Sequence, residues 1–394
     1  MSQWTSFNAF LQEALQAESD EQRQKLVDAL LAERKQWPWI EGNRATFVLS
    51  RPDVETAALN LDTIQADPPF AMMTNLPGTT FWYVTQEFAP DDLLDYMLAI
   101  NDPLTPLANE PDVIGRVARY WEVDSLNPLR METPQMSVSV LRMNNARPFP
   151  DWHAMPRVPR GRVYEHQIDS DEVGFSGRRL WVYTPPGYEG SGLAYPLLVL
   201  HDGQWAIGPL QAPFIADALI KHRRMEPAII AMIQSGSQEE RHREYACDDR
   251  HYGFLLTELL PLLQTRYRVD SARIGIGGVA LGAASAAHAA LNNPAVFTSL
   301  FMISPPMGKG PAQEQLTQIP TRFANAERLP ERIFLSVGRY EARSRFLRPA
   351  HALSDILEGR TTTRFRFVEI GSGHGLVGFR SILPEALAWV LPPR

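Results

Sequence analysis

Apolar residues in the first part of the chain recur at the spacing of an amphipathic helix. Between residues 4 and 35 they lie on one helical face with charged residues between them, at Phe7, Phe10, Leu11, Leu15, Leu26, Val27, Leu30 and Leu31. Because positions three and four apart share a helix face, the pattern predicts a helical hairpin or one broken helix within residues 1–38. We expect its apolar face to pack against the next domain.

After residue 39 the pattern changes to that of short β-strands. Four segments are β-branched or aromatic and are separated by turn residues: 45–50, 57–61, 80–85 and 95–100. Several short strands at this spacing predict a small antiparallel β-sandwich over residues 39–130. Its aromatic residues fit either a ligand platform or the sandwich core, and core packing is the more common role: Trp37, Trp39, Phe81, Trp82 and Tyr83.

The rest of the chain reads as a linker followed by a larger domain. Residues 131–160 are rich in proline and show weak periodicity, which predicts a linker. Residues 161–394 start with two strands of antiparallel type, and apolar strands then alternate with helices. This alternation indicates a mostly parallel sheet covered on both faces, so the expected fold class is α/β.

Composition narrows the possible partners. A chain of 394 residues with 44% hydrophobic and 21% charged residues is long enough for two or three ordinary globular domains. A net charge of -7 disfavours nucleic acid as a partner, because nucleic-acid binders usually carry a basic patch.

Cysteine content and the search for targeting signals bear on disulfides, metal sites and the cellular compartment. Cys247 is the only cysteine, which excludes an internal disulfide and a thiolate metal cluster, and we expect no metal or other cofactor. The N-terminus lacks a secretory pattern, and no run of about 18 apolar residues occurs. We therefore expect a cytoplasmic protein that does not span a membrane.

The most informative motif lies between residues 273 and 288. An apolar strand, a glycine-rich turn and a helix of small residues follow one another, with Gly278-Val-Ala-Leu-Gly282 at the turn. Serine hydrolases mount their nucleophile on such a turn in the form GxSxG, where the serine oxygen attacks the substrate. Ala280 occupies the nucleophile position and has no oxygen.

The other members of a catalytic triad follow in the expected order. Glu341 lies just past one predicted strand, and His374 lies in a glycine loop just past the next. A triad needs these types because an imidazole takes the nucleophile's proton while a carboxylate orients it. Asp355 and Glu358 are rival acids, but they lie on the following helix.

An oxyanion hole is predicted from two backbone segments. In α/β-hydrolases one donor is the N–H of the residue after the nucleophile, here Leu281, and the other comes from a loop after an earlier strand. The segment His201-Asp-Gly-Gln-Trp205 follows such a strand, so Gly203 and Gln204 are the candidates for the second donor.

Several further segments share the pattern of one known family. They are Thr184-Pro-Pro-Gly-Tyr188, His201-Asp-Gly203, Arg241-His-Arg-Glu-Tyr-Ala-Cys247, the glycine turn, Gly338–Glu341, Ser372-Gly-His374, Phe379-Arg380 and Leu387-Ala-Trp389. From Arg178 onward the chain resembles the esterase family that includes the enterochelin (ferric enterobactin) esterases and feruloyl-type esterases. In the sandwich, Tyr96–Asp102 and Asp124-Ser-Leu-Asn-Pro128 are similar to the N-terminal domain of enterochelin esterases.

The resemblance implies an α/β-hydrolase domain and a small-molecule ligand. The ligand would be an ester or a siderophore-like molecule, and a homo-oligomer remains open. The residues that would line the ligand site are His201, Asp202, Trp205, Arg241, Glu244, Tyr245 and Cys247.

The chain departs from the family pattern at the reactive centre. Ala280 replaces the serine, Val279 stands where a polar residue is common, and Ala283 stands where a glycine is usual. Three apolar differences favour a natural loss over an engineered change. Removing the nucleophile of a protease triad lowers the rate on the order of 10⁶-fold. The expected function is therefore ligand binding without serine-dependent hydrolysis.

Two other functions stay open. The chain would be an active carboxylic ester hydrolase if His374 activated a water molecule, or if Cys247 or Tyr245 replaced the serine. Ser285 is more than a helical turn from Ala280 and is expected to lie away from the nucleophile site. A structural or regulatory role of the whole chain is the third and weakest interpretation.

Overall fold

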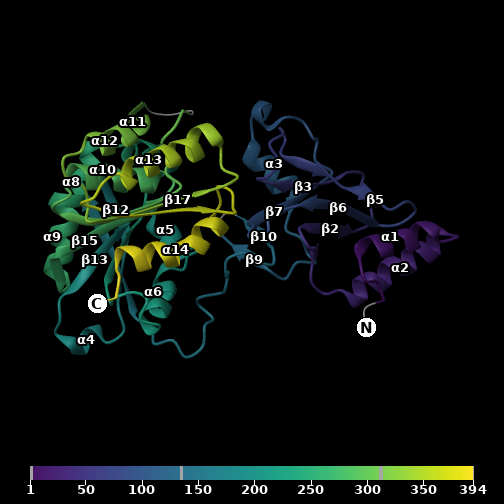
Figure 1. Ribbon diagram of the computed structural model, residues 1–394, viewed down its shortest axis with the longest axis horizontal. Helices are drawn as coiled ribbons and strands as arrows, with labels where there is room; N and C mark the ends of the chain where they lie inside the picture. Colours follow the sequence, from purple (N-terminus) through teal and green to yellow (C-terminus); the bar gives the residue numbers. More distant parts are fainter. Residues whose placement is uncertain (1–2, 134–135, 310–313, 394) are drawn as a thin grey trace. The chain divides into compact units, whose positions relative to one another are not determined.

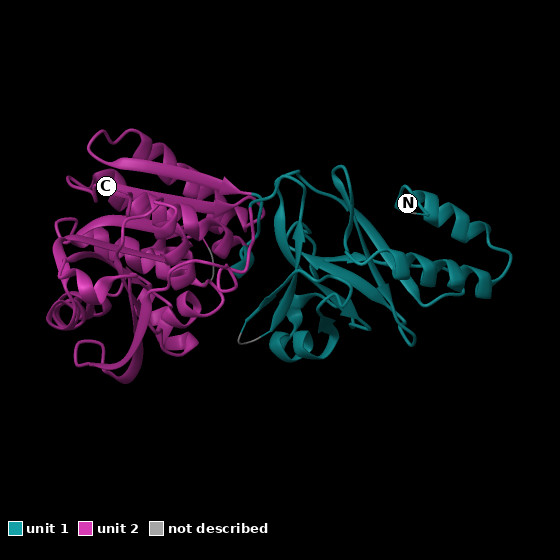
Figure 2. Cartoon of the chain, turned by 90° about the horizontal axis from the view of Figure 1, so that it is seen from below, with its two compact units in different colours: residues 1–147, 371–377 teal, residues 148–370, 378–394 magenta. Residues whose placement is uncertain are grey.

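A computed structural model describes residues 3–133, 136–309 and 314–393 of the chain, which divides into two units (Figure 2). Unit 1 comprises residues 1–147 and 371–377, and unit 2 comprises residues 148–370 and 378–394. The segment 371–377 was expected within the domain 161–394. Its assignment to unit 1 matters for the candidate site described below.

The predicted hairpin is confirmed as two helices, α1 (Phe7–Gln16) and α2 (Asp20–Glu33). Each begins where a serine hydroxyl accepts a hydrogen bond from a backbone N–H of the first turn, Ser6 from Ala9 and Ser19 from Gln22. Their apolar faces share a buried cluster with Trp37, Trp39 and Phe81. These three aromatic residues are therefore core residues rather than a ligand platform.

The predicted sandwich is confirmed, with every strand pairing antiparallel. One sheet has the order β1 (Trp39–Glu41), β2 (Arg44–Ser50), β6 (Phe81–Glu87), β5 (Thr74–Asn75). The other has the order β4 (Phe70–Met72), β3 (Ala57–Leu61), β7 (Leu93–Ile100), β10 (Ser137–Arg142), β9 (Arg130–Glu132), and β8 (Trp121–Glu122) also pairs with β7. The rings of Phe47 and Tyr96, one from each sheet, meet at 4.8 Å.

The linker predicted over residues 131–160 is wrong in its first half. Strand β10 is an inner strand of the sandwich, and unit 1 continues to Arg147. The segment Ser137–Arg142 alternates polar and apolar residues as a strand does. The pattern is only six residues long and lies in a proline-rich stretch, so it did not predict a strand. Weak periodicity also hid two elements of unit 1, η1 (Leu107–Asn109) and α3 (Val113–Tyr120).

Two motifs that suggested the sandwich meet inside it. The Tyr96 hydroxyl donates to Asp124 Oδ2 at 2.7 Å and accepts from Asn127 Nδ2 at 3.0 Å. All three residues are buried. This polar cluster ties the segment after β8 to the middle of β7.

Unit 2 contains the predicted α/β sheet. Its order is β11 (Arg162–Ser170), β12 (Phe175–Thr184), β14 (Ile229–Ile233), β13 (Tyr195–Leu200), β15 (Val269–Val279), β16 (Phe297–Ile303), β17 (Arg332–Gly338), β18 (Arg364–Ile370). The first two strands are antiparallel, and the run from β14 to β18 is parallel. The strand segments predicted from residue 161 onward are confirmed.

Helices cover both faces of this sheet. In Figure 1, α8 (Asp249–Phe254), α10 (Leu281–Asn292), α12 (Ile319–Asn325) and α13 (Arg348–Glu358) lie on one side, and α5 (Gly203–Ile207), α6 (Ala212–Lys221) and α14 (Leu376–Val390) lie on the other. The remaining helical segments are α4 (Tyr188–Ser191), α7 (Gln238–Tyr245), η2 (Leu255–Leu259), α9 (Leu260–Arg266), α11 (Glu314–Thr317) and η3 (Arg343–Leu347). None of the helices described is long and apolar enough to cross a membrane.

Candidate active site

The parallel strands bring the predicted site segments of unit 2 to one edge. Because β13, β15, β16 and β17 are adjacent and parallel, their carboxyl ends lie together, where open α/β sheets bind ligands. The segment 201–205 follows β13, Ala280 follows β15 and Glu341 follows β17. The topology thus gathers these three loops.

The turn at Ala280 has the geometry of a nucleophile elbow. Ala280 has φ 49° and ψ −125°, a conformation that residues with a side chain rarely adopt, and it immediately precedes α10. A Cβ on Gly278 would lie 2.5 Å from the carbonyl carbon of Gly282, so only glycine at position 278 lets the backbone at these two residues approach so closely. The side chain that the elbow presents is a methyl group.

Both predicted oxyanion donors lie at the start of helices. Leu281 is the first residue of α10, and Gly203 and Gln204 begin α5. The first N–H groups of a helix have no acceptor within it, so they can bind an oxyanion. The Gln204 side chain is fixed by Ser235, to whose hydroxyl its Nε2 donates at 2.6 Å.

The predicted acid is buried and held within unit 2. Oε1 of Glu341 accepts hydrogen bonds from the Gly338 N–H at 2.7 Å and from the Ser304 hydroxyl at 2.5 Å. Ser304 directly follows β16 and has φ 53°. Sequence reasoning missed Ser304, although its place after the strand next to the elbow strand was a usable signal.

The predicted histidine belongs to unit 1. His374 lies in the segment 371–377, which contains the loop between β18 and α14 and the first two residues of α14, and which groups with the sandwich. Its backbone N–H donates to Asp62 Oδ2 at 3.0 Å. The pairing of His374 with Glu341 stays a prediction.

Most of the residues expected to line the ligand site are buried, within or beside the segment 201–205 that follows β13. Arg241 makes a two-pronged ion pair with Asp202, at 2.7 Å for both bonds. Glu244 makes another with Arg178, at 2.5 and 2.6 Å. Tyr245 is also buried, and its hydroxyl accepts from the Asp202 N–H at 3.3 Å. Trp205, which stacks under Arg241 at 4.8 Å, is partly exposed.

His201 is also buried, and it contacts Ser285 of α10, the helix that follows Ala280. Its Nε2 lies 3.2 Å from both the Ser285 hydroxyl and Nε2 of His251. Burial lowers the pKa of His201 to about 4, so the imidazole is neutral at pH 7. Ser285 is only 4% exposed, and its hydroxyl is engaged by His201.

Neither alternative nucleophile is ionised near neutral pH. Burial raises the pKa of the Cys247 thiol to about 11. Burial, with Asp202 nearby, also raises the pKa of the Tyr245 phenol well above its usual value. Both side chains are therefore poor nucleophiles as they stand.

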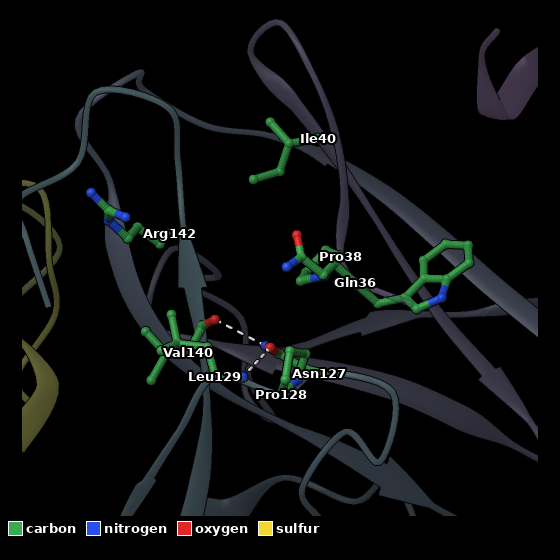
Figure 3. A pocket seen from close by; sticks show the side chains of 9 residues that line it. Gln36, Pro38, Ile40, Asn127, Pro128, Leu129, Val140 and Arg142 are labelled. Atoms are coloured by element: carbon green, nitrogen blue, oxygen red, sulfur yellow. Dashed lines mark hydrogen bonds between the residues drawn. The ribbon is translucent and has the colours of Figure 1, made fainter. Parts of the chain in front are cut away.

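Unit 1 has a hollow of its own, of about 410 Å³, between the segment before β1 and β10 (Figure 3). Its floor includes Asn127, whose side chain donates to the Val140 carbonyl at 2.9 Å and accepts from the Leu129 N–H at 2.8 Å. The hollow contains no predicted site residue. Within the described part of the chain, no three His, Cys, Asp or Glu side chains gather as metal ligands.

Sequence comparison finds similarity to esterases. Residues 176–389 match the sequence model of a family described as "Putative esterase". The iron(III) enterobactin esterase of Escherichia coli (strain K12) is 26% identical over 163 residues, covering 41% of this chain and 40% of that protein. The match therefore spans less than half of the curated relative's length.

Structural comparison extends the similarity to both units. An enterobactin esterase from Shigella flexneri, solved in the presence of enterobactin, has a TM-score of 0.76 at 20% identity and covers 92% of this chain and 97% of that chain. The ferric enterobactin esterase from Salmonella typhimurium has a TM-score of 0.75 at 19% identity, covering 92% and 98%. At these identities the likeness concerns the fold, an α/β-hydrolase domain preceded by a β-sandwich.

Proposed function

Because the chain belongs to the esterase family whose sequence model matches residues 176–389, we propose that it binds an ester or siderophore-like small molecule without serine-dependent hydrolysis. The elbow carries this proposal. Ala280 keeps the strained φ and ψ of a nucleophile position, yet its side chain has no oxygen to attack a carbonyl carbon.

The proposal assigns ligand binding to backbone donors close to Ala280 in the sequence and at the carboxyl end of β13. In this proposal the N–H groups of Leu281 and of Gly203 or Gln204 polarise the carbonyl oxygen of a bound ester. The proposal assigns His374 and Glu341 to the triad positions of base and acid. Without a hydroxyl at Ala280 no acyl-enzyme forms there, and the ester stays intact.

The class of ligand is inferred from the relatives. Two solved structures of similar fold are enterobactin esterases, one of them in the presence of enterobactin. Enterobactin-like siderophores are esters that carry aromatic rings. The partly exposed Trp205, at the end of the segment 201–205, suits contact with an aromatic group.

The alternative function, an active ester hydrolase with a displaced nucleophile, has less support. Cys247 and Tyr245 are protonated at neutral pH because burial raises their pKa. The Ser285 and Ser304 hydroxyls are buried and hydrogen-bonded to other side chains. Water activated by His374 remains the competing mechanism.

Titration of the full-length protein with a ferric catecholate trilactone tests binding. We expect saturable quenching of the fluorescence of its nine tryptophans, with the trilactone recovered intact by chromatography. Absence of binding would contradict the proposal.

Variants at position 280 test whether the lack of a side-chain oxygen there prevents ester hydrolysis. We expect Ala280→Ser to hydrolyse p-nitrophenyl esters and the trilactone, and Ala280→Ser with His374→Ala not to. Ala280→Gly is the matched control, because it changes the same residue without supplying an oxygen. If the unmodified protein hydrolyses these substrates and His374→Ala abolishes that activity, the protein is an enzyme and the non-hydrolytic function is wrong.

A further inference from the structure

The loop that carries His374 has a glycine at every second position, Gly371, Gly373 and Gly375. In unit 1 each of them faces a carboxylate of the sandwich. A Cβ added to Gly371 would lie 2.6 Å from Asp92 Oδ1, one added to Gly375 would lie 2.7 Å from Asp95 Oδ1, and one added to Gly373 would overlap the Asp62 carboxylate. The glycines therefore make room for side chains of unit 1.

Hydrogen bonds of the backbone attach this loop to the sandwich. The Leu93 N–H donates to the Gly371 carbonyl at 2.8 Å, at the start of β7. The His374 N–H donates to Asp62 Oδ2 at 3.0 Å, just beyond the end of β3. The second bond acts on the backbone of the histidine itself.

The sandwich places Asp62, an exposed residue, beside Asp95. Leu61 pairs with Tyr96 in the register of β3 and β7, which brings Asp62 next to Asp95. Burial, together with the negative charge of Asp62, raises the pKa of Asp95 to about 6, and His374 has the opposite effect. The two carboxylates and the histidine thus interact electrostatically.

We propose that Asp62 is a positioning residue for His374: its carboxylate fixes the loop backbone from which the imidazole projects. A loop with three glycines has little conformational preference of its own, so its geometry must be imposed by its neighbours. An ionised acceptor gives a stronger bond to an N–H than a neutral one does. The inference rests on the triad position proposed for His374, but the bond itself does not depend on hydrolysis or ligand binding.

Hydrogen–deuterium exchange of the full-length protein tests this inference. Asp62→Ala should speed exchange of the His374 amide about 10- to 100-fold, the effect of losing a bond to a charged group. Asp62→Asn, which keeps an acceptor oxygen, should restore most of the protection. The rate of carbethoxylation of His374 by diethyl pyrocarbonate, read by mass spectrometry, should change in Asp62→Ala and recover in Asp62→Asn.

Asp112→Ala is the matched control. Asp112 also accepts a bond from one backbone N–H, that of Gly115 at 2.8 Å, and also lies over a glycine, but at the start of α3. Its loss should speed exchange at α3 and leave residues 371–377 unchanged.

Gly373→Ala tests the same contact from the loop side, should Asp62→Ala fail to fold. Its φ is not in the left-handed region, so the added methyl acts through its overlap with Asp62. We expect faster exchange at His374 with β15 still protected. Unchanged exchange and carbethoxylation of His374 in a folded Asp62→Ala or Gly373→Ala protein would overturn the inference. Failure of ligand binding alone would contradict only the proposed function.

Discussion

Ala280 is held in a backbone conformation that alanine seldom adopts. Residues in such regions of φ and ψ carry about 1–3 kcal/mol of strain, and they persist where the surrounding structure enforces them. Here the Ala280 N–H donates to the Ile303 carbonyl at 2.9 Å, and its carbonyl accepts from the Ala283 N–H at 3.0 Å. The neighbours therefore maintain an elbow that no longer presents an oxygen.

Ala280→Gly should stabilise the protein by about 1 kcal/mol. Glycine relieves the strain at positive φ, and part of this gain is offset by the greater freedom of the unfolded chain. The measurement is the free energy of unfolding in urea. Ala283→Gly, within α10, is the control and should destabilise by about 1 kcal/mol, since glycine weakens a helix interior. Equal effects of both changes would contradict the strain at Ala280.

Cys247 should react slowly with iodoacetamide at pH 7.5. Only a small fraction of the thiol is ionised well below a pKa of about 11, and alkylation requires the thiolate. The rate should keep rising up to that pKa in the folded protein, whereas free cysteine levels off nearer pH 9. Fast labelling at pH 7.5 would return Cys247 to consideration as a nucleophile.

At the scale of elements, the buried ion pairs connect segments distant in sequence. Asp202 follows β13, Arg241 and Glu244 lie on α7, and Arg178 lies on β12. A charge buried in a pair is costly to leave alone, so these bonds fix α7 relative to the loop that begins α5.

Arg241→Met should destabilise the protein by about 3–5 kcal/mol, because it leaves the Asp202 carboxylate buried without its partner. Adding Asp202→Asn should recover part of this loss, since asparagine tolerates the φ of 55° at that position. Arg250→Met is the control: its pair with Asp248 is exposed on the arginine side and should contribute under about 1 kcal/mol. Urea unfolding measures these variants together with Asp202→Asn alone, and strictly additive effects of Arg241→Met and Asp202→Asn would argue against the pair.

The sequence predicted most elements because their periods are local. The strands of unit 2, the hairpin at residues 1–38 and the elbow at Ala280 each follow from a run of adjacent residues. Strand β10 was missed because a strand of six residues in a proline-rich stretch gives too short a pattern. The contacts of Ser304 with Glu341 and of Asp62 with the His374 loop were missed because they join distant segments, and no local period records such a pairing.

At the scale of the whole molecule, each unit contains a titratable group with a shifted pKa, and the two respond to acid in opposite ways. The folded pKa of Asp95 is raised to about 6, so ionisation of Asp95 destabilises unit 1 as the pH rises through that value. The folded pKa of His201 is lowered to about 4, so unit 2 loses stability as the pH falls from about 6.5.

Replacing each group should therefore have effects of opposite sign. Relative to the unmodified protein, Asp95→Asn should be more stabilising at pH 7.5 than at pH 4.5, and His201→Asn more stabilising at pH 4.5 than at pH 7.5. Each difference should reach about 2–3 kcal/mol, as expected for a shift of about two pKa units. Calorimetric unfolding at the two pH values measures it, and differences of the same sign would contradict the assignment.

The grouping of residues 371–377 with the sandwich also decides what can be exchanged between related proteins. The segments to exchange together are residues 1–147 and residues 371–377, because they form one compact unit although they are not continuous in sequence. A chimera that joins residues 148–394 to a foreign sandwich would retain the elbow and Glu341. On the proposed role of Asp62, it would keep the His374 amide protected if the donor supplied an acceptor oxygen in the place of Asp62.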